Sequence, residues 1–89
     1  MEIKKGQKNF YVGDKKNPIA EITYYLSDDG NIVIDHTEVA DELRGKGIAG
    51  KLVAAVVEQA KAEGKKIKPI CSYAKNKMEK TPEYQDVLV

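Results

Sequence analysis

Residues 43–64 read LRGKGIAGKLVAAVVEQAKAEG, a glycine-rich stretch that runs directly into an apolar one. In the apolar stretch, hydrophobic residues recur at every fourth position, which is the spacing of one face of an α-helix. They are Ile48, Leu52, Val56 and Ala60, and Ala49, Val53 and Val57 widen the stripe. Gly64 follows where a helix commonly ends with a left-handed residue. The pattern predicts a long amphipathic helix from Gly47 to Gly64.

The glycine-rich part lies at the N-terminus of this predicted helix. The first N–H groups of a helix have no partner within it, and together with the helix dipole they attract anions. Arg44, Lys46 and Lys51 add positive charge nearby, so the local chemistry indicates phosphate binding. The alternative is a purely steric role, in which the glycines only let the chain turn into the helix.

The glycines of residues 45–50 also spell G-x-G-x-x-G, a pattern found in dinucleotide-binding proteins. That fingerprint follows the first strand of a βαβ unit and expects an acidic residue about twenty positions later. Here the corresponding residues are Lys-Pro-Ile-Cys, at 68–71. A Walker A loop needs Ser or Thr after its lysine, and Lys51 is followed by Leu52. Both assignments are excluded.

The sequence before the glycine-rich stretch is typical of strands and turns. Residues 8–12 and 19–26 are candidate strands, rich in β-branched and aromatic residues. Residues 27–31 contain an Asp-Gly pair between two apolar segments, which is typical of a tight hairpin. Residues 32–39 are therefore expected to form the partner strand.

The sequence after the long helix predicts one more strand and a short helix. Residues 65–70 suit a short strand, in which Pro69 favours an edge or a place where strands separate. A short helix is expected from about Ser72 to Lys80. Because a strand returns after a long helix, we expect it to pair in parallel with an earlier strand. The order of elements indicates an α+β fold.

The composition limits the number of domains and the classes of partner. Eighty-nine residues, 42% hydrophobic and 33% charged, suffice for one core, so residues 1–89 are expected to form a single domain. Residues 1–45 hold six Lys/Arg and nine Asp/Glu, whereas residues 46–89 hold nine and five, so an anionic ligand suits the second half better. A net charge of +1 without an aromatic RNA-binding motif argues against nucleic acid.

Membrane and metal binding are also disfavoured. The first residues form no apolar signal segment, and the longest apolar run, residues 52–57, is too short to cross a bilayer. We therefore expect a cytoplasmic protein without a membrane partner. Cys71 and His36 are the only residues of their kinds and have no companions at metal-ligand spacing, so no metal site is expected.

A family resemblance rests on residues 44–49, Arg-Gly-Lys-Gly-Ile-Ala. They resemble the (Q/R)-x-x-G-x-(G/A) acetyl-CoA signature of the GNAT superfamily of N-acetyltransferases, with Arg44, Gly47 and Ala49 in the defining positions. The resemblance to a subgroup of very small, single-domain GNAT-like proteins also includes the long helix and residues 34–39, 69–72 and 82–84. It implies a compact GNAT-like α+β fold, with a mostly antiparallel sheet whose strands splay at the cofactor cleft.

The resemblance implies acetyl-CoA as the cofactor and places it along two segments. Backbone groups of Glu38, Val39 and Ala40 would lie alongside the pantetheine arm. The pyrophosphate would lie on the amides of Arg44, Gly45, Lys46, Gly47, Ile48 and Ala49. The strand after the long helix would splay near Pro69, which would bring Cys71 close to the acetyl carbon.

Cys71 is one candidate catalytic residue. Acetyl transfer needs a deprotonated nucleophile, stabilisation of an oxyanion and a proton for the departing thiolate. Cys71 could accept the acetyl group itself or protonate the thiolate of CoA, and the alternative is a small packing residue at a strand end. A helix N-terminus and lysines would lower the pKa of its thiol, whereas apolar surroundings would raise it.

His36 and Glu38 are the other catalytic candidates. They alternate along one strand, so we expect them to share a face with Ile34, opposite to Thr37 and Val39. If that face looks into the cofactor cleft, either residue could deprotonate the amine, and His36 is preferred for its near-neutral pKa. The alternative is an exposed polar face. Tyr73 and Tyr84 could donate a proton, but tyrosines near the end of a domain more often pack.

The sequence therefore predicts an acetyl-CoA-dependent N-acetyltransferase that acts on an amine of a small molecule or a protein. One alternative is a non-catalytic acyl-CoA-binding or regulatory module. Another is an interaction module whose glycine loop binds a different phosphate ligand. Longer GNAT chains continue through further strands that form much of the acceptor pocket, and this sequence does not include them. The sequence also indicates no oligomeric state.

Overall fold

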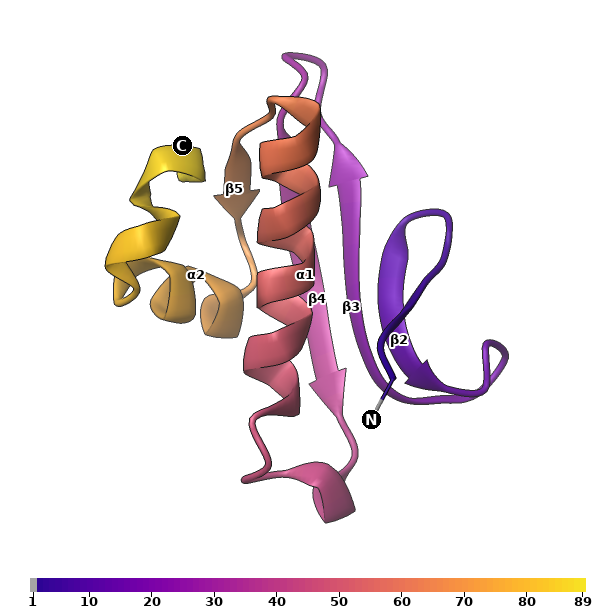
Figure 1. The fold of residues 1–89 in the computed structure, drawn as a ribbon. Helices are drawn as coiled ribbons and strands as arrows, with labels where there is room; N and C mark the ends of the chain where they lie inside the picture. The colour runs from indigo at the N-terminus through magenta and orange to yellow at the C-terminus, as the bar shows by residue number, and fades with distance from the viewer. Residues whose placement is uncertain (1) are drawn as a thin grey trace.

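A computed structural model describes residues 2–89 as a five-stranded sheet with helices on one face and at one edge (Figure 1). The strands are β1 (Lys4–Lys5), β2 (Asn9–Gly13), β3 (Pro18–Leu26), β4 (Ile32–Val39) and β5 (Ile67–Pro69). The α-helices are α1 (Ile48–Glu63) and α2 (Ser72–Glu79), and the 3₁₀ helices are η1 (Asp41–Leu43) and η2 (Pro82–Val87). The predicted strands, hairpin and helices are confirmed to within a few residues, whereas β1 and the two 3₁₀ helices were not predicted.

The strand order in the sheet is the order in the chain. β1 to β4 form an antiparallel meander, and β5 pairs in parallel with β4 after the chain has crossed over as α1. The predicted parallel pairing is therefore confirmed. The outer edge of β5 is covered by the end of the chain, because Leu88 bridges Ile67 and the Val89 N–H donates to the Ile67 carbonyl at 2.9 Å.

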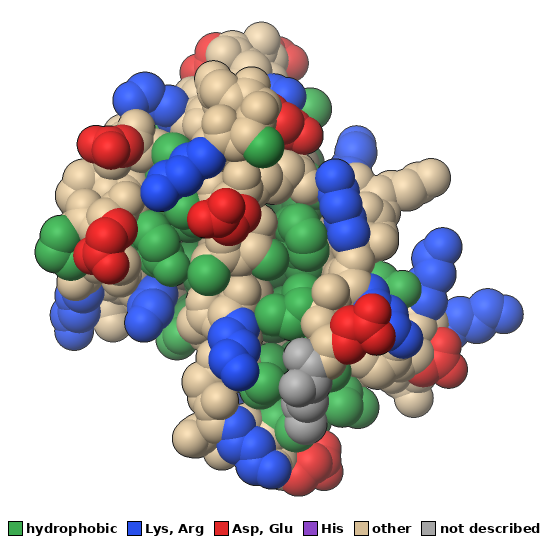
Figure 2. All heavy atoms as spheres, viewed as in Figure 1, with side chains coloured by type: hydrophobic (Ala, Val, Ile, Leu, Met, Phe, Trp, Pro, Cys, Tyr) green, Lys and Arg blue, Asp and Glu red, His purple; other side chains and the backbone are tan. Residues whose placement is uncertain are grey.

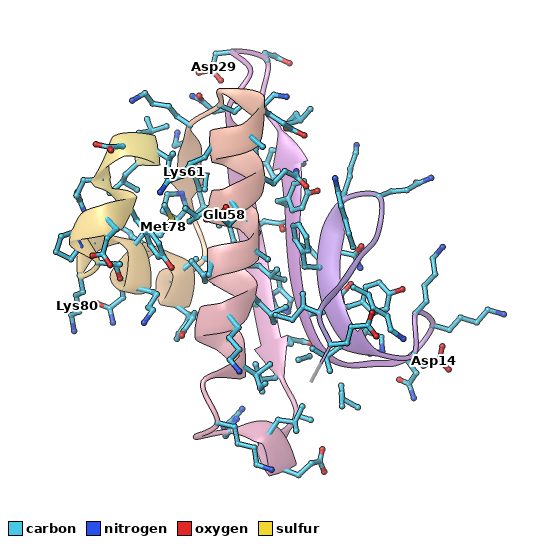
Figure 3. All side chains as sticks on the ribbon, viewed as in Figure 1. Asp14, Asp29, Glu58, Lys61, Met78 and Lys80 are labelled. Atoms are coloured by element: carbon cyan, nitrogen blue, oxygen red, sulfur yellow. The ribbon has the colours of Figure 1, made fainter. Side chains whose placement is uncertain are left out.

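The core lies between α1 and the sheet. Every residue of the predicted stripe except Ala49 is buried, and α1 ends at Gly64 as expected. The fully buried side chains include Ile22, Ile32, Ile34 and Ile67 from the sheet and Leu52, Val53, Val56 and Val57 from α1. Each such side chain contributes about 1.5–3 kcal/mol on burial. Met78 of α2 is also fully buried and lies on the side of α2 toward α1 (Figure 3).

The structure corrects the predicted faces of β4. His36 lies opposite Thr23 and Ile34 lies opposite Tyr24, so Asp35 is an extra residue in the β4 strand. A bulge of this kind reverses the alternation of faces beyond it. Ile34 is consequently buried in the core, whereas His36 is exposed on the other face. The prediction that His36 shares a face with Ile34 is wrong, because the simple alternation of faces along a strand cannot anticipate the extra residue.

Among residues 2–89, no helix combines the length and the apolar character needed to span a membrane.

Candidate functional site

The glycine-rich segment leads into α1 with an uncapped helix end. Gly47 is the N-cap residue and has φ +75°, in the left-handed region that favours glycine. No side chain caps the helix, and the first N–H group bonded within it is that of Lys51, which donates to the Gly47 carbonyl at 3.1 Å. The N–H groups of Ile48, Ala49 and Gly50 therefore point out of the helix end. We call these three groups the amide site.

The surroundings of the amide site are positively charged. Arg44, Lys46 and Lys51 are exposed, and the first turn of α1 contains no acidic residue. The Asp41 carboxylate lies 3.3 Å from Arg44 Nε. Figure 2 shows basic side chains, with an acidic one beside them, at the lower end of the molecule, where Figure 1 places the segment before α1. Helix dipole and side chains thus favour an anion at the same place.

The amide site opens into a pocket of about 680 Å³. The pocket is lined by residues 18–21, 37–40, 43–45 and 47–50 and by Tyr73. It therefore joins the start of β3, the end of β4, the glycine-rich segment and the first turn of α1. All the expected cofactor-binding residues line it except Lys46. The contribution of β3 was not predicted, because nothing local in residues 18–21 indicates a binding site.

One edge of β4 is open beside this pocket. β5 ends at Pro69, opposite Ile34, and the N–H groups of both Ile70 and Cys71 donate to the Ile34 carbonyl, at 3.0 and 3.1 Å. Beyond that point the chain turns into α2 and leaves β4 without a neighbour on this side. The alternating pattern of an antiparallel ladder directs the backbone N–H and C=O of Val39 toward the open edge. The expected separation of strands after Pro69 is present.

The backbone at the end of β4 points in two directions. The Ala40 N–H donates to the Ile19 carbonyl of β3 at 2.8 Å, so Glu38 and Ala40 direct their backbone groups toward β3. Thr37 and Val39 direct theirs toward the open edge. Of the three residues expected beside the pantetheine arm, Glu38, Val39 and Ala40, Val39 is therefore the one whose backbone groups are available there.

Cys71 lies where β4 and β5 separate, at the N-cap position of α2. Its sulfur lies 3.5 Å from the hydroxyl oxygen of Thr37, and its side chain is partly buried. Burial raises the pKa of the thiol, whereas hydrogen bonds from the Ala74 N–H and from Thr37 lower it. The N–H of Tyr73 contributes in the same direction, so the net pKa is lowered. The N-terminus of α2 thus favours the thiolate.

His36 and Glu38 form an ion pair on the opposite face of β4. His36 Nε2 donates to Glu38 Oε1 at 2.9 Å, and the two side chains are 59% and 71% exposed. This hydrogen bond raises the pKa of His36, and the negative charges of Glu38 and Asp35 add to the effect. His36 and Glu38 thus share a face of β4, as expected. Because Thr37 contacts Cys71, its neighbours His36 and Glu38 point away from Cys71.

No group of three or more His, Cys, Asp or Glu residues within 2–89 is arranged to hold a metal ion.

Comparison with known proteins identifies the family. The family model described as GCN5-related N-acetyl-transferase matches residues 9–87. The chain belongs to this family. It is 50% identical to a GCN5-like candidate N-acetyltransferase from Staphylococcus aureus whose structure was solved by NMR, with a TM-score of 0.85. The match covers 99% of this chain and 87% of that one. None of the curated proteins compared with the chain matches it.

Membership in the GCN5-related N-acetyltransferase family confirms the resemblance and the α+β fold, and it makes this chain a member of a family of acyltransferase enzymes. Sequence reasoning on this acetyltransferase missed the approach of α2 to the first turn of α1, where Tyr73 lines the pocket. A Cβ atom at Gly50 would lie 3.8 Å from the Tyr73 hydroxyl and 3.7 Å from Lys77 Nζ. Tyr73 and Lys77 are four residues apart and share a helix face, which is the signal that could have paired them.

Proposed function

We propose that this acetyltransferase binds acetyl-CoA in the pocket and transfers its acetyl group to an amine. The observation that carries the proposal is the path of the pocket from the amide site along the open edge of β4, with Cys71 beside that edge. The pocket has a volume typical of small-molecule sites. Bound acetyl-CoA would supply an activated acetyl thioester.

The residues present fit the parts of this cofactor. The amide site, with Arg44 and Lys51, would bind the pyrophosphate, because free N–H groups and cations suit phosphate oxygens. The other amides of residues 44–49 lie in the same segment. Val39 would bond to the amide-containing pantetheine arm through its backbone, with Glu38 and Ala40 on either side along the strand. In this arrangement the thioester would point toward the end of β5.

Cys71 would act as the nucleophile. Its lowered pKa favours the thiolate, which attacks the thioester carbonyl carbon. The acetyl group would pass from the CoA sulfur to the sulfur of Cys71, with release of the CoA thiolate. The amine nitrogen then attacks the acetyl carbon, and Cys71 leaves as a thiolate in turn. The amine loses its proton during this second step.

His36 and Glu38 would accept that proton. Because both side chains point away from Cys71, the proton would reach them through water. Glu38 holds the imidazole by its Nε2 atom and raises its basicity, so the pair suits a proton acceptor on that side.

Non-catalytic acyl-CoA binding is the second candidate function. One observation favours it: His36 is exposed and points away from Cys71, so the two do not form a preassembled dyad. Two measurements decide between the functions. Isothermal titration with acetyl-CoA tests the binding common to both, and acetylation of a panel of amines and peptides tests catalysis. Binding without any acetylated product would favour the second function, and absence of binding would contradict both.

A further inference from the structure

The sheet has a second face, opposite α1, against which no helix packs in residues 2–89 (Figure 1). β3 alternates between the core beneath α1 and this second face, to which Glu21, Thr23 and Tyr25 point. Residues that pair across strands share a face, so the β4 residues Glu38 and Val33 lie here as well. We call this surface the outer face.

Acidic side chains lie in the middle of the outer face. Glu21 and Glu38 are direct cross-strand partners, an arrangement that is unfavourable for two like charges. Asn9 of β2 donates a hydrogen bond to Glu21 at 2.7 Å. The Thr23 hydroxyl donates one to Asp35, the extra residue of β4, at 2.6 Å. Neighbouring strands thus hold three carboxylates on one surface.

The chain supplies little positive charge to the middle of the outer face. Lys4 and Lys68 point to this face from β1 and β5, the first and last strands of the sheet. Between them lies His36, whose pKa is raised by its hydrogen bond to Glu38 and by the charges of all three carboxylates. Among residues 2–89, no Lys or Arg forms an ion pair with any of the three. The centre of the outer face therefore favours a cation supplied from outside the chain.

Apolar side chains lie beside the carboxylates. Ile19 and Tyr25 are 41% and 42% exposed and lie on either side of Glu21 along β3. Tyr11 and Val33 are buried, although neither belongs to the core beneath α1. A lysine side chain suits such a surface, because its aliphatic stem packs on apolar groups while its ammonium group binds a carboxylate.

We propose that the outer face binds a lysine-rich peptide segment of a partner protein. Charge complementarity decides for this occupant, since ammonium groups would pair with the three carboxylates while lysine stems pack on Ile19 and Tyr25. A second copy of the chain is a poorer occupant, because two outer faces packed together would oppose two sets of like charges. The inference goes beyond the proposed function, since binding at this face requires neither acetyl-CoA nor Cys71.

The test compares two double variants that remove the same charge. Glu21→Gln with Asp35→Asn changes the outer face, keeps an oxygen acceptor at each position and leaves Glu38 in place. Glu58→Gln with Glu79→Gln is the matched control, because these exposed residues lie on α1 and α2. The probe is a short synthetic peptide of alternating Lys and Ala, titrated into each protein without acetyl-CoA and followed by amide NMR.

We expect the lysine peptide to shift the amides of residues 21–25 and 33–38 in the parent and in the control. It should bind the outer-face variant about tenfold more weakly. The same peptide with Glu in place of Lys should not bind the parent, and about 0.5 M NaCl should weaken the lysine peptide. These last two measurements use the parent alone, so they do not depend on the folding of any variant.

Several results would overturn the inference. They are no binding of the lysine peptide to the parent, equal binding of the Glu peptide, shifts that avoid the outer face and an equal loss in both double variants. A dimer of the parent formed through this face, detected by sedimentation, would also overturn it, because a second copy would then be the occupant. Absence of acetyl-CoA binding would contradict the proposed function alone, since the peptide is titrated without acetyl-CoA.

Discussion

The sulfur of Cys71 lies 3.5 Å from the hydroxyl oxygen of Thr37, a contact between residues 34 positions apart. It joins the N-terminus of α2 to the open edge of β4, where the proposed acetyl group would arrive. The same contact places His36 and Glu38, the neighbours of Thr37, on the other face of the strand. β4 thus separates the proposed nucleophile from the proposed proton acceptor.

Thr37→Val should raise the pKa of the Cys71 thiol. The substitution keeps the branched shape and removes a hydroxyl that stabilises the thiolate, while the N–H groups of Ala74 and Tyr73 continue to lower the pKa. The rate of alkylation by iodoacetamide as a function of pH measures the change. Thr37→Ser retains a hydroxyl and serves as the control. An unchanged pH profile in Thr37→Val would show that the hydroxyl does not act on the sulfur.

Cys71 should form a covalent adduct. Parent protein mixed with acetyl-CoA and no amine should release CoA and carry one acetyl group on Cys71, detected by intact mass and removed by hydroxylamine. Cys71→Ser should bind acetyl-CoA nearly as well without forming the adduct, because an unactivated hydroxyl is a far weaker nucleophile than a thiolate.

Two other outcomes for Cys71 have distinct meanings. If Cys71→Ser slows acetylation of an amine but no adduct is ever trapped in the parent, then Cys71 donates a proton to the CoA thiolate. If Cys71→Ala changes amine acetylation by less than about twofold and the parent forms no adduct, then Cys71 is a packing residue.

Gly47→Asp should nearly abolish CoA binding. The position is left-handed, and a carboxylate would lie beside the amide site that is proposed to hold the pyrophosphate. Gly47→Asn is the matched control, because Asn tolerates the same backbone conformation and carries no charge. Titration calorimetry should show a much larger loss for Asp than for Asn. If both variants fold and bind CoA equally well, the pyrophosphate does not lie at the amide site.

Substitutions at Gly50 within α1 and at Gly64 just after it should change stability in opposite directions. Gly50 is within the helix and a Cβ there makes only ordinary contacts, so Gly50→Ala should stabilise the fold by about 0.5–1 kcal/mol. Gly64 has φ +68°, and Gly64→Ala should destabilise it by about 1–2 kcal/mol. Urea unfolding measures both effects. Destabilisation by Gly50→Ala would mean that Lys77 and Tyr73 cannot accommodate the methyl group.

Glu38→Gln should lower the pKa of His36. The Glu38 carboxylate accepts a hydrogen bond from the imidazolium and raises the pKa in the folded protein. A raised pKa stabilises the folded state at pH values below the unfolded pKa, and this contribution disappears as the pH rises through the folded value. The stability difference between parent and Glu38→Gln should therefore be present at acidic pH and vanish at alkaline pH. NMR titration of the single histidine measures the pKa, and an unchanged value would contradict the ion pair.

Local sequence patterns determined most of the secondary structure. Apolar residues at every fourth position from Ile48 mark α1, and the pair Asp29-Gly30 marks the hairpin, because each pattern depends only on residues within a few positions of one another. The parallel pairing of β5 also followed from local elements, since a long helix between two strands leaves the chain at the end from which a parallel strand must start. The pattern of glycines and basic residues before α1 likewise predicted that this segment lines a binding pocket.

The tertiary structure alone decided which side chains meet at the site. The extra residue Asp35 reverses the faces of β4, and that reversal puts Thr37 rather than His36 beside Cys71. Lys77 reaches Gly50 only because α2 packs against α1, which no pattern within either helix specifies. These contacts depend on strand register and on the placement of one helix against another, and both are set by the packing of the whole core, to which residues distant in the sequence contribute together.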